Sequence, residues 1–202
     1  MGYKRTTEPT SEPITTAEAK SHCRVDHTAD DTLIDTYISA ARRWCEDWQN
    51  RTAYTTTWTL KLDCFPDRDT GVGAQRAARI DLPRGPVASV TSIVYVDSDG
   101  NNQTIDASDY VLDNSGTMGN SVYPAYGEVW PTPRNQPNCV TVVYVAGAAT
   151  TGAIPATFKQ AVKLLVGHWY ENRESVLVGT ISKEIEFAAT ALLAMEDAST
   201  VG

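Results

Sequence analysis

The strongest pattern along the chain is a helical one near the N-terminus. Between about residues 30 and 50, apolar side chains recur so that, at ~100° per residue, they fall within an arc of roughly 140°. Polar residues, among them Arg42, Glu46 and Gln49, are predicted on the opposite side. The pattern predicts a long amphipathic helix with this apolar side: Leu33, Ile34, Tyr37, Ile38, Ala41, Trp44, Cys45 and Trp48.

A second helix-start signal stands just upstream of this helix. Thr15 is expected to be the N-cap of a short helix over about residues 16–23, and Glu18 completes a capping box. Before it, residues 1–13 are polar and contain proline, which is typical of a loose chain. We therefore expect a flexible N-terminal arm that leads into two helices.

In the middle of the chain the period changes to that of a strand. Trp58, Leu60 and Leu62 alternate with polar residues, as in a half-buried strand. Further on, Asp99-Gly100 follows a β-branched run and predicts a hairpin. These signals predict several antiparallel strands separated by loops rich in glycine and proline.

The boundaries of this β region are set by where the helical period stops and resumes. We expect an inserted antiparallel β domain over residues 54–146, with strand-like runs that include 128–130 and a loop over 66–78. After Pro155, which suits the first turn of a helix, apolar residues spread over roughly 200° at helical rotation. So wide an arc predicts burial on two sides.

A loop over 175–183 and a short apolar terminal helix complete the prediction. The expected fold class is α+β, with a small helical bundle formed by the N- and C-terminal helices (14–53 and 154–196) and an inserted antiparallel β lobe.

Composition and charge narrow the classes of function. The 202-residue chain has 25 acidic and 17 basic residues, a net charge of -8, and four irregularly spaced cysteines. An acidic balance argues against gripping nucleic-acid phosphates, although DNA could still slide past an acidic wall. The cysteines are expected to be buried apolar groups rather than disulfides or zinc ligands. With no apolar run long enough for a membrane span and no secretory signal, we expect synthesis in the cytoplasm.

Candidate chemistry is sparse. Asp97–Asn102 resembles a calcium loop, but the expected glycine and glutamate positions are occupied by Asn102 and Ser108, so a turn is favoured. Glu171 and Glu174 could form a carboxylate pair, yet nothing indicates a cleft around them. We predict no catalytic residue, no cofactor and no metal site, and therefore no enzyme.

The order and spacing of four regions resemble the head-tail connector, or adaptor, proteins of tailed phages. No single string is diagnostic, and the resemblance lies in their succession over roughly residues 12–196. The matching segments are Pro13–Lys20 with Arg24–Asp26; Asp30–Ile34 with Ala40–Arg42 and Trp44; Leu82–Val87 with Val90–Ile93 and Tyr95–Gly100; and Val140–Gly147 with Ile154-Pro155 and the helix that ends in His168–Glu174.

This resemblance implies a structural protein of the virion neck. The expected partners are copies of itself in a ring of twelve under the portal, the portal protein, and the next neck protein, a stopper or tail terminator. DNA would pass through the channel without specific binding, no membrane would be involved, and assembly would start in the host cytoplasm. We expect the subunit interface to use these residues: Arg42, Arg43, Trp169, Glu171, Arg173 and Glu174.

The terminal helix has an expected role of its own. Because so short a helix is hardly stable alone, we predict that it orders by docking on the portal or on a neighbouring subunit, through Phe187, Leu192, Leu193 and Met195. The alternative is a carbohydrate- or protein-binding module of a phage tail, whose active part would be the β lobe with Tyr123, Tyr126 and Trp130.

Overall fold

The chain divides into two units, which the computed structural model describes for residues 2–66, 78–115, 120–173 and 181–198. The β unit comprises residues 1–9 and 55–147, and the helical unit comprises residues 10–54 and 148–202. The α+β fold class is thereby confirmed. None of the described helices has both the length and the apolar character of a membrane span.

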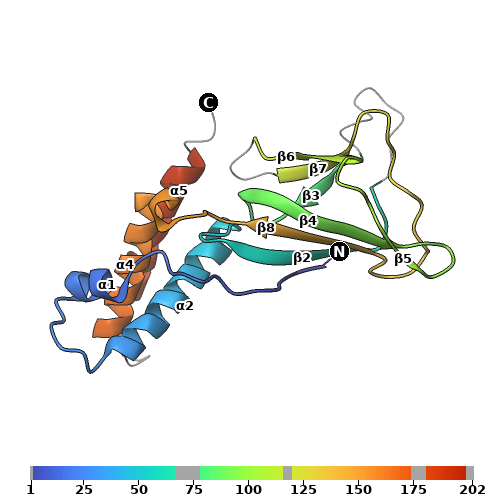
Figure 1. The fold of residues 1–202 in the computed structure, drawn as a ribbon. Coiled ribbons are helices and arrows are strands. Elements are labelled where there is room, and N and C mark those ends of the chain that lie inside the picture. The colour runs from blue at the N-terminus through green and yellow to red at the C-terminus, as the bar shows by residue number, and fades with distance from the viewer. Residues whose placement is uncertain (1, 67–77, 116–119, 174–180, 199–202) are drawn as a thin grey trace. The chain divides into compact units, whose positions relative to one another are not determined.

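The β unit contains two antiparallel sheets that share one core (Figure 1). The five-stranded sheet has the order β1-β2-β8-β4-β5, and the three-stranded sheet has the order β3-β7-β6. The strands are β1 (Gly2–Arg5), β2 (Thr56–Leu62), β3 (Ile80–Leu82), β4 (Val87–Val96), β5 (Asn102–Thr104), β6 (Tyr110–Asp113), β7 (Asn120–Pro124) and β8 (Val140–Ala146).

The central strand β8 organises the β unit. Its residues alternate strictly between buried and half-buried, so that Val140, Val142 and Tyr144 face the core between the sheets. The second sheet contributes Ile80 and Val122 to the same core. The two sheets are also joined by a hydrogen bond of 2.6 Å from the Tyr144 hydroxyl to the Pro83 carbonyl, which gives the buried phenol a partner.

In the part of the helical unit that the structure describes there are four α-helices and one short 3-10 turn. These are α1 (Thr16–Cys23), α2 (Asp31–Gln49), η1 (Thr151–Ala153), α4 (Ala156–Glu171) and α5 (Ile181–Ala198). The predicted capping box of α1 is confirmed, because Thr15 and Glu18 exchange hydrogen bonds in both directions. Helix α4 packs against the other three helices and buries Phe158, Val162 and Leu165 in the core.

The prediction of a loose arm over residues 1–13 is wrong for its first part. Gly2–Arg5 forms strand β1, which pairs antiparallel with β2. Tyr3 meets the ring of Trp58 edge-on at 5.9 Å between centroids, and the Arg5 guanidinium lies 5.1 Å from that ring. An edge strand with mostly exposed side chains carries little apolar signal, so its polar composition concealed it.

The buried side of α2 also differs from the predicted one. Arg42, Glu46 and Gln49 were expected to face solvent but are buried, whereas Trp48 is 42% exposed. Each buried polar group has partners. The Arg42 guanidinium lies 2.9 Å from Glu46 and 2.7 Å from Glu12, and a Glu46 oxygen accepts the Ala53 amide at 2.9 Å. Burial of the two charges is tolerated because Arg42 and Glu46 satisfy each other, and the Gln49 side-chain N–H donates to the Leu193 carbonyl.

Two smaller predictions concern loops. Residues 128–130 were expected to form a strand, but they run as irregular chain, since Pro131 and Pro133 interrupt the ladder that would pair there. Most of the predicted loop 66–78 and of the predicted loop 175–183 lies outside the described residues, and α5 already begins at Ile181.

The buried ion pair of α2 gives a first prediction. Replacing Glu46 with alanine leaves the Arg42 charge with less compensation and the Ala53 amide without this acceptor. We expect the free energy of unfolding to fall by about 3–5 kcal/mol, as for other broken buried pairs, measured by urea denaturation. Removing both charges, as Arg42→Met with Glu46→Gln, should cost less than Glu46→Ala alone. A loss under about 1 kcal/mol for Glu46→Ala would contradict this.

Candidate functional site

The end of α4 is fastened to the start of α2 by one carboxylate. Asp30, at the N-cap of α2, accepts hydrogen bonds from the Tyr170 hydroxyl and from the Arg173 guanidinium, each at 2.7 Å. The Arg173 guanidinium also lies 4.8 Å from the centre of the Tyr170 ring. These bonds lower the pKa of Asp30, first through Tyr170 and then through Arg173. Sequence reasoning missed this cluster, because its members are about 140 residues apart.

The residues expected at a subunit interface fall into two groups. Arg43, Glu171 and Arg173 are exposed, and Trp169 is half-buried, with its ring edge-on to Tyr37 at 6.2 Å. Arg42 is corrected: it is only 2% exposed and belongs to the buried ion pair inside the unit. Glu174 lies outside the described residues.

Helix α5 has two distinct sides. Ala189 and Leu193 are fully buried in the helical core, and the Leu193 carbonyl accepts a hydrogen bond of 2.9 Å from the Gln49 side chain. On the other side, Phe187 is 74% and Met195 63% exposed. The predicted docking strip is therefore corrected at Leu193, which faces inward and serves the fold. Leu192 is half-buried and packs against the core of the same unit.

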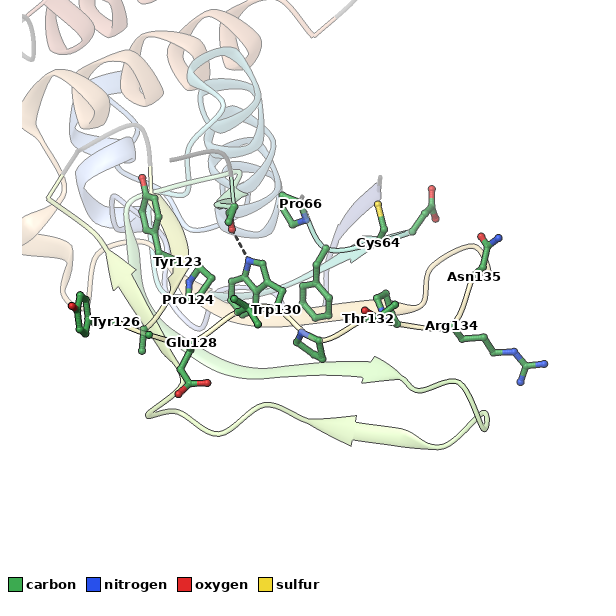
Figure 2. A pocket seen from close by; sticks show the side chains of 18 residues that line it. Cys64, Pro66, Tyr123, Pro124, Tyr126, Glu128, Trp130, Thr132, Arg134 and Asn135 are labelled. Carbon is green, nitrogen blue, oxygen red and sulfur yellow. Dashed lines mark hydrogen bonds between the residues drawn. The ribbon is translucent and has the colours of Figure 1, made fainter. Parts of the chain in front are cut away.

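The β unit contains a cavity of about 490 Å³ with an aromatic wall (Figure 2). Phe65 and Trp130 stack with 5.1 Å between ring centroids and 10° between ring planes, and the Trp130 indole N–H donates to the Ala78 carbonyl at 2.5 Å. Tyr123 and Tyr126 lie on the same rim, and Tyr126 is 98% exposed. The cavity thus gathers the three aromatic residues that the sequence singled out for a binding module.

The walls of the cavity suit binding by contact and hydrogen bonding. Four prolines in the lining supply rigid apolar surface, and Asp63, Glu128 and Arg134 supply its charges. Asp63 already accepts the Asn138 amide at 2.7 Å, which occupies one of its oxygens. Phe65, the stacking partner of Trp130, was not predicted, because it stands 65 positions earlier and shares no local pattern with it.

The four cysteines differ in their surroundings. Cys45 and Cys139 are buried, as expected for small apolar groups, whereas Cys64 is exposed and Cys23 half-buried; all four are free thiols. Burial raises the pKa of the Cys45 thiol to about 12, so this thiol stays protonated at neutral pH.

The comparison with known families decides which kind of protein this is. A model of the head completion protein family matches residues 12–184, which include most of both units. The chain belongs to the head completion protein family. The family match agrees with the resemblance to phage connector proteins in the sequence. No curated protein sequence matches the chain.

Solved structures show the same fold over almost the whole chain. A chain of the virion of a native gene transfer agent particle is 24% identical, with a TM-score of 0.74. Chains from the neck of the empty particle, computed with C6 symmetry, and of the native particle, computed with C12 symmetry, are 23% and 22% identical, with TM-scores of 0.74 and 0.71. Each match covers 96% of this chain and 94% of the other. The family fold therefore extends through both units.

The Asp30 cluster gives a prediction about pH. The Asp30→Asn variant loses the charged partner of Arg173, so it should unfold at a lower temperature than the wild type near neutral pH. Because the folded pKa of Asp30 lies below its unfolded value of about 3.9, this contribution is present above that value. It is lost as the pH falls through the folded pKa. The difference in melting temperature should therefore vanish in acid, and a constant difference from pH 7 to pH 2 would contradict the assignment.

The aromatic wall gives a prediction about stability. Trp130→Ala removes the stack on Phe65 and the hydrogen bond to Ala78, and we expect a loss of about 2 kcal/mol, less than for a fully buried tryptophan. Tyr126→Ala is the matched control, because so exposed a ring should change the free energy of unfolding by less than about 0.5 kcal/mol. Chemical denaturation measures the free energy of unfolding of both variants. If Trp130→Ala lost no more than Tyr126→Ala, the stack would not stabilise the fold.

Proposed function

We propose that this protein is a structural, non-enzymatic subunit of the neck of a tailed virus-like particle. Copies would form a ring beneath the portal, twelve for a dodecameric portal, and join the head to the tail. The ring would surround a channel for DNA and offer its other face to the next neck protein, a stopper or tail terminator. The protein would be assembled in the host cytoplasm and reside in the virion neck.

The family match carries this proposal. Head completion is a structural task in particle assembly, and the match spans residues 12–184. Two structures with the same fold are described as necks computed with C6 or C12 symmetry. Cyclic symmetry is the symmetry of a closed ring of identical subunits. The fold agrees over 96% of the chain, so both units of this protein have counterparts there.

The charge of the chain fits a channel better than a DNA-binding protein. With 25 acidic and 17 basic residues, the protein lacks the excess of lysine and arginine that binding through counterion release requires. An acidic wall repels the phosphate backbone, so the duplex would move past without adhering.

The outer side of α5 and the exposed end of α4 are the proposed assembly surfaces. Phe187 and Met195 place two large apolar side chains in solvent, an arrangement that favours contact with another protein. Arg43, Glu171 and Arg173 are exposed charged residues, and they would suit the margin of such an interface, where charges are usual.

A second candidate function is favoured by the aromatic cavity of the β unit. Tyr123, Tyr126 and Trp130 line it together, as in a module that binds carbohydrate or an extended peptide. A protein of this kind would stay monomeric beside purified portals and bind glycans, and Tyr126→Ala would weaken that binding.

Electron microscopy of the purified protein mixed with its cognate portal tests the proposal directly. We expect a closed ring on one end of the portal and co-sedimentation of the two proteins. Deleting residues 184–202 removes the exposed side of α5 and should abolish co-sedimentation, whereas circular dichroism should still report a folded β unit. Truncated protein that sediments with the portal would contradict the role of α5. Wild-type protein that does not co-sediment with the portal would contradict the proposed function.

A further inference from the structure

The five-stranded sheet has one face in the core, and among the described residues its other face has mostly half-buried or exposed side chains. At one edge of that face, the Thr6 and Thr59 hydroxyls are hydrogen-bonded at 2.6 Å. On the same face, the register aligns three rows of side chains across β2, β8 and β4. The rows are Thr57–Val145–Ser89, Thr59–Val143–Ser92 and Lys61–Thr141–Val94. We call these nine residues the outer sheet face. All of them except Thr59 are half-buried or exposed.

The outer sheet face is almost free of charge. Lys61 is the one charged residue among these nine, and the others are valine, threonine or serine, although the chain as a whole has 42 charged residues, 25 acidic and 17 basic. On the edge strand β1, Lys4 pairs with Thr59 and puts a second lysine at the margin of this face. Charged and other polar residues are usual on a sheet face that contacts solvent. The core of a protein interface, by contrast, is depleted in charged residues. This face therefore has the composition of a surface that another protein covers.

The outer side of α5 has the matching properties. From Phe187 to Met195 the sequence contains no charged residue. Phe187, Ala188, Ala194 and Met195 are exposed, opposite the buried Ala189 and Leu193. We call Phe187, Ala188, Ala191, Ala194 and Met195 the α5 strip. Its alanines allow a close approach to a sheet, and its two large side chains can enter between the rows.

The two surfaces also agree in length. Phe187 and Met195 are eight residues apart, which is about 12 Å along a helix at 1.5 Å per residue. The three rows of the outer sheet face span four residue steps along β8, about 13 Å at 3.3 Å per step. The α5 strip can thus lie along the strands and cover all three rows.

We propose that the α5 strip of one subunit covers the outer sheet face of the next copy in the ring. A cyclic ring needs two different, complementary surfaces on each subunit, because each contact is heterologous, and these two surfaces form such a pair. The inference rests on the proposed function, and it selects a neighbouring copy, in place of the portal, as the partner of α5.

Two charged substitutions, each with a matched control, test the junction. Val143→Arg puts a charge in the central row of the sheet face, and Val143→Thr is its uncharged control. Phe187→Glu puts a charge in the strip, and Phe187→Leu is its control. Because Val143 is half-buried and Phe187 exposed, the variants should fold, which circular dichroism checks. Ser92→Arg, in the same row, serves as a second variant if Val143→Arg does not fold.

With the cognate portal, wild type and both controls should form closed rings by electron microscopy, and both charged variants should lose them. Val143→Arg retains an intact strip and Phe187→Glu an intact sheet face. An equimolar mixture should therefore form pairs in sedimentation velocity, while each variant alone stays monomeric.

The outcomes separate the two proposals. Closed rings of Val143→Arg, or a mixture without pairs, overturn the junction and leave the neck function standing. If Phe187→Glu loses the rings but Val143→Arg keeps them, the α5 strip binds the portal, and the proposed junction between copies is overturned. Wild-type protein that forms no ring on the portal overturns both the neck function and the junction.

Discussion

The helical unit depends on a buried group of charges at the C-terminal end of α2. Arg42 is held between Glu46 and Glu12, and Glu46 also accepts the amide of Ala53. One helical turn further, Gln49 binds the Leu193 carbonyl of α5. Three segments far apart in the chain therefore meet on one helix end: the segment before α1, the turn after α2, and α5. Since an ion buried without partners costs several kcal/mol, Glu12 and the turn after α2 stabilise the buried charges of Arg42 and Glu46, and α5 adds a neutral hydrogen bond to the same helix end.

This constraint explains how α5 can serve the fold and still keep an exposed apolar side. Its inner side, with Ala189 and Leu193, is fixed in the core of the helical unit, and a hydrogen bond to α2 sets its position along the axis. The outer side is thereby presented at a defined orientation, with its apolar side chains in place before any partner arrives. A preorganised surface of this kind loses less conformational entropy on binding than a flexible tail would.

The sequence predicted those features whose causes are local. The capping box of α1 lies within one turn, and the alternation in β2 reflects one strand against one core, so both were recognisable. The aromatic residues of the cavity rim were also found, because Tyr123, Tyr126 and Trp130 lie within eight positions.

The predictions that were wrong or missing concern features that depend on residues far apart in the sequence. The inward side of Arg42 and Glu46 depends on Glu12 and Ala53, and the Asp30 cluster depends on Tyr170, so neither leaves a local pattern. Strand β1 resembled a loose segment because an edge strand buries little of its own surface. The burial of such a residue depends on its partner elsewhere in the fold. A pattern within one sequence does not identify that partner.

The register of β2, β8 and β4 has a mechanical meaning. Seven residues of β2 face seven of β8, and β4 continues the ladder on the other side, so the hydrogen bonds lie side by side across the strands. Tension applied along β8 would load these hydrogen bonds together in shear. They would then not break one after another, as the bonds of a hairpin do when it unzips. The β unit is therefore built to resist a pull along its strands more strongly than a pull across them.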